Sequence, residues 1–193
     1  MARNVEFIPQ EKVEKALHVF WQKGYHATSM QDLVDAMQIN RSSLYNSFQD
    51  KHSLFLECLR SYAELSRIDY EAVARQQGLS ALQVLDLLID HIAEMTVQRE
   101  NACMSVRSCF EMAAHDPEVQ RVLRAANTRI VALLQNLLTA AEQAGDIQLQ
   151  DRPEVVASHL SSNFCGWWHS YLLSEDSALI KKMAALLKAS LRT

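Results

Sequence analysis

The stretch that decides the fold is residues 28–51, TSMQDLVDAMQINRSSLYNSFQDK. Within it, apolar residues recur at the spacing of one helical face: Leu33, Val34 and Met37. Thr28 or Ser29 can cap this helix, because a short side-chain oxygen accepts from the free N–H groups of the first turn. Gln31 follows Thr28 at the spacing of a capping box. The pattern predicts a helix, a tight turn and a second short helix.

The second helix is predicted from Arg41 to about Phe48, and Asn40 starts it. Arg41 is its only charged residue, and the rest of its surface is polar or aromatic: Ser42, Ser43, Tyr45, Asn46 and Ser47. A helix without acidic residues and with small hydrogen-bonding side chains suits an approach to base edges and phosphates. The alternative interpretation is a short surface helix in a small bundle.

Helices are also expected on both sides of this pair. Gln10 to Lys23 carries an apolar face and is followed by Gly24, which is typical of a helix end. Asp50 is expected to cap a long helix that Gln77-Gly78 breaks, with Lys51 beside its N-terminus. That long helix is the predicted bridge between two domains.

The run from about Phe7 to Arg67 resembles the N-terminal DNA-binding domain of the tetracycline-repressor (TetR) family. The resemblance covers about a third of the chain. It rests on FWQKGYHATSM, DLVDAMQI, RSSLYNSF and an Asp50-Lys51 pair followed by Leu54. The patterns Gly-Tyr-x-x-Thr-Ser and Leu-Tyr-x-x-Phe-x-x-Lys are together specific to this family. One departure is the turn, where the family usually has a glycine and this chain has Met37-Gln38-Ile39.

The resemblance implies a one-component transcriptional regulator, usually a repressor. Such a protein is a homodimer on operator DNA and leaves it when a small molecule binds the C-terminal domain. By position, Thr28 and Ser29 should reach the DNA backbone, and Lys51 should hold a phosphate at a helix N-terminus. Bases or phosphates should be met by the polar face of the second helix: Arg41, Ser42, Ser43 and Tyr45, with Asn46 and Ser47 nearby.

Composition predicts an all-α fold. The 193 residues are 49% hydrophobic and include only 4 Gly and 3 Pro, which favours long helices over many-turned β folds. We expect a three-helix DNA-binding domain over residues 7–67, with the helix-turn-helix motif at about 29–48. A helical effector-binding and dimerisation domain should follow over 78–193. No apolar run suits a membrane span or signal peptide, so a cytoplasmic protein is expected.

The charge pattern argues against a general nucleic-acid coat. The formal net charge is -4, whereas non-specific affinity comes from neutralising phosphates. From Met1 to Lys51, acidic and basic residues balance. The prediction of DNA binding therefore depends on where charges are placed and not on their sum.

Five more helices are predicted beyond Gly78. Ser80 with Gln83 forms a capping box, and Asp116 followed by Pro117 is a strong helix start. The others begin at Cys103, after a turn at Asn101-Ala102, then near Pro153 and near Ala178. The last two carry broad apolar stripes and are the predicted homodimer surface, through a four-helix bundle. In the alternative, both stripes are buried within one subunit.

Candidate effector-binding residues come from apolar and aromatic positions of the C-terminal helices, because such pockets lie between helices. They are His91, Met95, Cys103, Phe110, Phe164, Trp168 and His169. The alternative, which Met and aromatic residues favour when taken one by one, is that each is part of the core. The expected effector is small and apolar or electrophilic.

Cys103 carries a separate hypothesis. The segment from Ala102 to Val106 resembles a cysteine-containing segment in a subgroup of the family, some of whose members sense electrophiles or oxidants. A helix N-terminus favours a thiolate, and Arg107 one turn on could add to this. The alternative is a buried, unreactive thiol.

Two other classes of function are alternatives to a DNA-binding regulator. A helical enzyme could use Cys103, Cys109 and His115, although their spacing fits no common zinc site. No Gly-rich phosphate loop or His-Glu-x-x-His motif occurs. A protein–protein adaptor without DNA binding is the third class. The sequence predicts no catalytic residue, metal or cofactor, and its four cysteines, without Cys-x-x-Cys, are expected to be free thiols.

Overall fold

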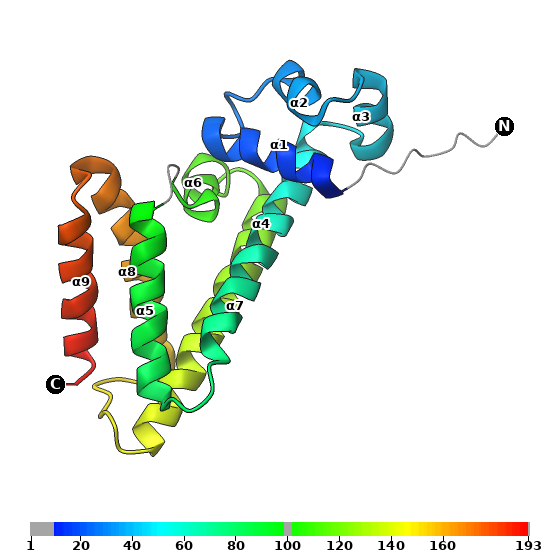
Figure 1. The fold of residues 1–193 in the computed structure, drawn as a ribbon. Coiled ribbons are helices and arrows are strands. Elements are labelled where there is room, and N and C mark those ends of the chain that lie inside the picture. Colours follow the sequence, from blue (N-terminus) through cyan, green and yellow to red (C-terminus); the bar gives the residue numbers. More distant parts are fainter. Residues whose placement is uncertain (1–9, 99–101, 193) are drawn as a thin grey trace. The chain divides into compact units, whose positions relative to one another are not determined.

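The computed structural model describes residues 10–98 and 102–192 (Figure 1). Within these ranges the regular structure is entirely helical. The helices are α1 (Gln10–Lys23), α2 (Met30–Met37), α3 (Arg41–Phe48), α4 (Lys51–Ala74), α5 (Ala81–Gln98), α6 (Met104–Glu111), α7 (Pro117–Gln143), α8 (Pro153–Ser174) and α9 (Ser177–Ser190). The predicted all-α class is confirmed.

The chain divides into two compact units, described here one at a time. The N-terminal unit contains the described residues up to Leu65 together with Cys103–Leu123. The C-terminal unit contains Ser66–Ala102 and Arg124–Thr193, apart from the residues that are not described. Helices α4 and α7 each contribute residues to both units. The sequence-based division instead assigned all of 78–193 to the second domain, so the placement of α6 differs from that expectation.

The core of the N-terminal unit explains why α6 belongs there. Large apolar side chains of α1 to α4 are buried together, including Phe20, Leu33, Leu44 and Phe55. Three residues from the later segment are buried in the same cluster: Met104, Met112 and Val119. Burying a side chain of this size contributes roughly 1.5–3 kcal/mol. The segment is therefore part of this core and not only its neighbour in space.

Local capping sets the ends of the helix-turn-helix pair. Ser29 is the N-cap of α2: its hydroxyl accepts from the Asp32 N–H at 3.1 Å, and the Asp32 carboxylate accepts from the Ser29 N–H at 2.8 Å. The capping box thus uses Asp32, and the predicted partner Gln31 is corrected. Gln31 instead donates to Asp35 at 2.8 Å.

The turn between α2 and α3 adopts the conformation that glycine favours. Gln38 has φ 53° and ψ 47°, in the left-handed region, and its N–H donates back to the Asp35 carbonyl. A non-glycine residue there costs some strain. The missing glycine noted in the sequence therefore changes the energy of the turn and not its form.

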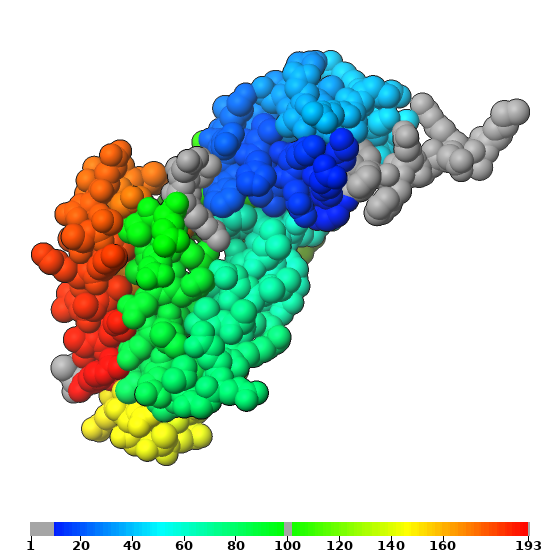
Figure 2. Space-filling model, in the orientation of Figure 1, coloured from blue at the N-terminus to red at the C-terminus, as the bar shows by residue number. Residues whose placement is uncertain are grey.

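The C-terminal unit has its own apolar core. Helices α5 and α9 lie side by side along much of their length (Figures 1 and 2), joined by a Lys188–Asp90 ion pair at 2.7 Å. Buried side chains from α5, α7, α8 and α9 include Leu88, Leu134, Trp167 and Ile180. Trp167 is therefore a core residue. No helix within the described ranges combines the length and apolarity needed to cross a membrane.

Most predicted helix starts beyond Gly78 are confirmed. Ser80 and Gln83 make the reciprocal bonds of a capping box, at 2.8 and 3.3 Å. The Asp116 carboxylate accepts from the N–H groups of Glu118 and Val119, both at 3.0 Å. Residue 101 of the predicted turn lies outside the described residues.

Candidate nucleic-acid interface

Helix α3 is anchored from one side and exposed on the other. Leu44 is fully buried, and the side-chain carbonyl of Asn40 caps the helix by accepting from the Ser43 N–H at 2.7 Å. The exposed residues include four of the predicted DNA contacts: Arg41, Ser42, Tyr45 and Asn46. The other two, Ser43 and Ser47, are half-buried. Because the helix carries no acidic residue, this face can approach a polyanion without repulsion.

Two side chains on this face lie together. The Arg41 guanidinium carbon is 5.8 Å from the centroid of the Tyr45 ring, within cation–π range. Tyr45 is 41% exposed, so its ring face and hydroxyl are accessible at the surface. The pair presents one positive charge, one hydroxyl and one flat ring on a short helix. Such groups can bind phosphates, base edges and thymine methyl groups.

The two residues predicted to reach the DNA backbone at the start of α2 differ in their exposure. Ser29 is exposed at the N-terminus of α2, as such a contact requires. Thr28 is only 2% exposed, and its hydroxyl donates to the Gly24 carbonyl at 2.6 Å. Thr28 therefore stabilises the connection between α1 and α2, and its predicted contact with DNA is corrected.

Lys51 lies in the first turn of α4, beside the ring of Tyr25. Its Nζ is 4.4 Å from the ring centroid. Partial burial lowers the pKa of Lys51, while Glu111 and Asp32 act in the opposite direction. Burial also raises the pKa of Tyr25, as do Asp50 and Asp116. The Tyr25 ring holds the Lys51 ammonium at the N-terminus of α4. A phosphate there would be attracted by the ammonium and by the positive end of the helix dipole.

Helix α6 supplies two residues that the sequence did not assign to the DNA-binding part. The Arg107 guanidinium donates to the carbonyls of Trp21, Gln22 and Lys23 at 3.1, 2.9 and 2.9 Å. The Glu111 carboxylate accepts from the N–H groups just beyond, at Tyr25 (3.2 Å) and His26 (2.8 Å). An Arg-x-x-x-Glu pair is visible in the sequence, but its partners lie 84 to 86 residues away.

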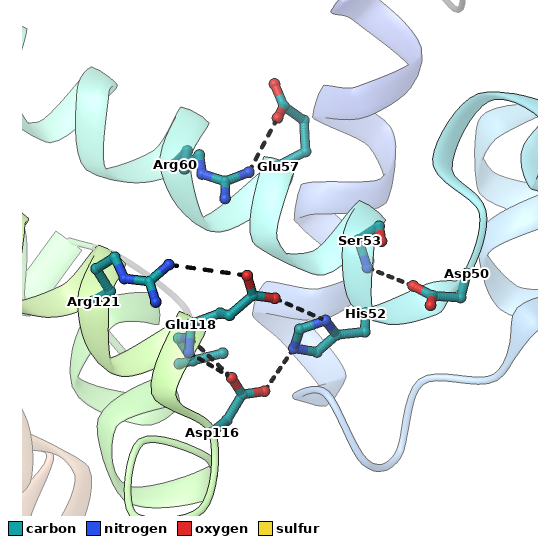
Figure 3. Close-up of polar contacts among 9 residues, drawn as sticks. Asp50, His52, Ser53, Glu57, Arg60, Asp116, Glu118 and Arg121 are labelled. Carbon is teal, nitrogen blue, oxygen red and sulfur yellow. Dashed lines mark hydrogen bonds and ion pairs between the residues drawn. The ribbon is translucent and has the colours of Figure 1, made fainter.

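A second polar cluster joins the starts of α4 and α7 (Figure 3). His52 lies between two carboxylates, with Nε2 2.6 Å from Asp116 Oδ2 and Nδ1 4.0 Å from Glu118 Oε2. Burial raises the pKa of Asp116, but hydrogen bonds from the Val119 N–H and from His52 outweigh it and leave that pKa below its usual value. The cluster ties the first turn of α4 to α7 within the same unit.

The predicted effector-binding residues do not form one group. Cys103 and Phe110 belong to the N-terminal unit, whereas the other five belong to the C-terminal unit. Phe110 is 86% exposed and His169 is also exposed, so neither lines a closed site in the single chain. Met95, Phe164 and Trp168 are buried, and His91 pairs with Asp69 at 2.8 Å.

Cys103 stands at the N-cap position of α6 without capping it. It is half-buried, and the Tyr62 hydroxyl donates to its Sγ at 3.5 Å. Arg107, which the sequence suggested as a stabiliser of the thiolate, bonds the α1 carbonyls. Cys109 and His115 are exposed, and the described residues contain no cluster of three or more His, Cys, Asp or Glu placed to hold a metal ion.

Comparison with known proteins agrees with this geometry. Residues 13–58 match the family model of the bacterial regulatory proteins of the tetR family. The HTH-type transcriptional regulator YezE of Bacillus subtilis (strain 168) is 29% identical over 152 residues, 78% of this chain and 78% of that protein. The HTH-type transcriptional repressor ComR of Escherichia coli (strain K12) is 24% identical over 183 residues, 93% of this chain and 85% of that protein.

Solved structures share the whole fold. The transcriptional regulator FadR from Bacillus subtilis, solved in complex with stearoyl-CoA, superposes with a TM-score of 0.74 at 14% identity, over 92% of this chain and 96% of that one. The exposed acid-free helix on a helix-turn-helix scaffold, with these matches, defines a sequence-specific DNA-binding transcriptional regulator. Residues 13–58 carry the DNA-binding domain of the tetR family of bacterial regulatory proteins.

Proposed function

We propose that this regulator is a repressor that binds a palindromic operator as a homodimer and is released by a small apolar or electrophilic effector. The observation that carries the proposal is the exposed face of α3, where Arg41 and Tyr45 stand on a helix free of acidic residues. The relative named as a repressor, ComR, supports the direction of regulation. A cytoplasmic location follows from the proposed role, because a bacterial operator lies in the cytoplasm.

The proposed DNA contacts are divided by chemistry. Base edges and phosphates are assigned to the polar face of α3: Arg41, Ser42, Ser43, Tyr45, Asn46 and Ser47. The DNA backbone is assigned to Ser29 and Lys51, each at a helix N-terminus. Lys51→Ala should therefore weaken binding to all sequences and reduce the salt dependence by about one phosphate contact.

The homodimer is proposed to form through α8 and α9. Each buries one face in its own subunit, yet large apolar side chains remain exposed on both: Val155, Leu172 and Leu173 on α8, and Leu179 and Leu186 on α9. Pairing two copies would cover them in a four-helix bundle. Two reading helices are needed because one α3 contacts few base pairs. Sedimentation velocity should give a dimer at micromolar concentration, and a monomer would contradict the proposal.

The effector is proposed to bind between helices of the C-terminal unit. Candidates with partly or fully buried side chains there are His91, Met95, Phe164 and Trp168. The FadR structure holds an acyl-CoA thioester, which supports an apolar ligand for a chain of this fold. A thermal-shift screen of fatty acids, quinones, aldehydes and antibiotics should find a compound that raises Tm and releases DNA.

An electrophile-sensing role for Cys103 is a second candidate. The Cys103 side chain is only half-buried, and its sulfur accepts a hydrogen bond from the Tyr62 hydroxyl, so a small electrophile can reach it. Peroxide or N-ethylmaleimide should then release DNA from the wild type but not from Cys103→Ser. An equal response of both proteins, or none, would contradict this role.

Gel shift with the promoter region of the protein's own gene tests the main proposal. We expect a discrete complex that persists with excess non-specific DNA, and a footprint with two half-sites about one helical turn apart. Absence of any specific complex would contradict the DNA-binding role. It would favour the protein–protein adaptor, and turnover of a substrate would favour the enzyme.

A further inference from the structure

Outside the proposed DNA-binding surface, two charged side chains of α6 form hydrogen bonds to the backbone of the link between α1 and α2. The last carbonyls of a helix have no partners within it and carry the negative end of the helix dipole. In α1 three of them, on Trp21, Gln22 and Lys23, accept from the guanidinium of Arg107. Arg107 thereby acts as a C-terminal cap supplied by a distant helix.

Glu111 binds the chain immediately beyond these carbonyls. Its two oxygens accept from consecutive N–H groups, those of Tyr25 and His26. Hydrogen bonds to a charged group are about twice as strong as neutral ones. The pair therefore holds residues 21–26 by five hydrogen bonds from one turn of α6: three from Arg107 and two to Glu111.

Glycine is favoured at position 24 by its positive φ, and a Cβ there would also crowd the charged ends of Arg107 and Glu111. Gly24 has φ +82°, and a Cβ added to it would lie 2.7 Å from Glu111 Oε2 and 3.0 Å from Arg107 Nε. The sharp turn and the hydrogen bonds of Arg107 and Glu111 therefore both depend on Gly24. Its carbonyl in turn accepts from the buried Thr28 hydroxyl, one residue before the cap of α2.

Both proposed phosphate-binding groups are positioned by the segment that is held. The ring that supports the Lys51 ammonium belongs to Tyr25, whose own N–H is bound by Glu111. Ser29 follows directly after Thr28. Lys23 also bonds Asp32 of the α2 capping box at 2.6 Å. A shift of residues 21–26 would displace both backbone contacts at once.

We propose that Arg107 and Glu111 are positioning residues for DNA binding. They hold the α1–α2 link in the form that places Lys51 and Ser29 against the phosphates. Neither residue touches DNA. The α6 segment is continuous at both of its ends with residues of the C-terminal unit. This inference rests on the proposed DNA-binding function.

Operator affinity of two variants separates positioning from general electrostatics. Glu111→Gln makes the protein less negative, so long-range attraction alone would tighten DNA binding. The positioning role instead predicts weaker binding, roughly tenfold. Arg107→Lys keeps the charge, but one ammonium cannot reproduce the guanidinium fork, so it should also lose roughly tenfold. The control Arg121→Ala, on a largely exposed side chain in the same unit, should stay within about threefold.

A double-mutant cycle with Lys51 separates positioning from mere stability. If Arg107 places Lys51, Lys51→Ala should cost several-fold less affinity in an Arg107→Ala background than in the wild type. All affinities are measured at a temperature where circular dichroism shows each variant fully folded. Hydrogen exchange should show faster exchange at Tyr25 and His26 in Arg107→Ala.

Three results would overturn the inference. They are equal effects of Lys51→Ala in both backgrounds, tighter operator binding by Glu111→Gln, or unchanged exchange at Tyr25 and His26. A wild-type protein that binds no operator would overturn the proposed function and this inference together. A wild type that binds, with variants that bind equally well, would overturn the inference alone.

Discussion

Helices α3 and α6 have the same length, eight residues, belong to the same unit, and each carries one arginine. They use it in opposite ways. Arg41 of α3 stands on an exposed face beside the ring of Tyr45. Arg107 of α6 is bound to three carbonyls of α1. One helix exposes its charge to solvent, and the other uses its charge to hold the protein's own backbone.

The two helices also differ in how they are stabilised. Asn40 caps α3 locally, so its start depends on neighbouring residues. Cys103 makes no capping hydrogen bond at α6, which relies on buried Met104 and on contacts far along the chain. A helix that is stabilised by its neighbours in sequence, such as α3, does not need its polar face for folding. A helix that is stabilised by distant contacts, such as α6, also fixes the position of the segments it contacts.

The largest expected effect tests whether α6 is part of the N-terminal core. Met104→Ala should lower the free energy of unfolding by about 2–5 kcal/mol, because Met104 is 1% exposed and packed in that core. Phe110→Ala on the same helix is the control and should change it by less than about 0.5 kcal/mol. Urea unfolding followed by circular dichroism measures both. Equal small effects would show that α6 is not anchored.

The next effect tests the exposed face of α3. Arg41→Ala and Tyr45→Ala should each weaken operator binding by about 1–3 kcal/mol per lost contact while leaving Tm unchanged. The side chains stand on the exposed face, so the fold does not depend on them. Fluorescence anisotropy with labelled operator measures the loss. A specific complex unaffected by both changes would mean that another surface reads the DNA.

A smaller effect is expected from the local cap of α3. Asn40→Ala should cost about 1 kcal/mol of stability, because the bond from the Ser43 N–H is lost. Asn46→Ala, an exposed position in the middle of the same helix, is the matched control and should be near neutral. Thermal unfolding measures Tm for both variants. Similar Tm values would show that the Asn40 side chain does not stabilise α3 by capping it.

The smallest effect concerns acid. Asp50 does for α4 what Asn40 does for α3, and the hydrogen bond from the Ser53 N–H lowers the pKa of Asp50 below its usual value. A carboxyl whose pKa is lower in the folded state stabilises the fold at pH values above its pKa in the unfolded state. This stabilisation is lost as pH falls through the folded-state pKa, below about pH 4. Asp50→Asn cannot titrate. Its Tm deficit relative to wild type at pH 5 should therefore shrink at pH 3, and a constant deficit would contradict this.

Much of the fold could be predicted because its signals are local. Ser80 with Gln83, and Asp116 before Pro117, satisfy N–H groups within three residues, so sequence spacing is sufficient. The same reasoning located the acid-free helix at Arg41–Phe48. The choice of Gln31 over Asp32 was a local error: Ser29-x-x-Asp32 has the same spacing, and its carboxylate accepts from the Ser29 N–H.

The sequence by itself determined the helices, most of their caps and the chemistry of the α3 face, since each depends on residues one to four positions apart. Only the tertiary structure decided that Thr28 is buried, that α6 joins the N-terminal core, and that Arg107 and Glu111 hold residues 21–26. The Arg107 and Glu111 contacts join chain segments more than eighty residues apart. No spacing rule reaches that far, because which carbonyl meets a guanidinium depends on how whole helices pack.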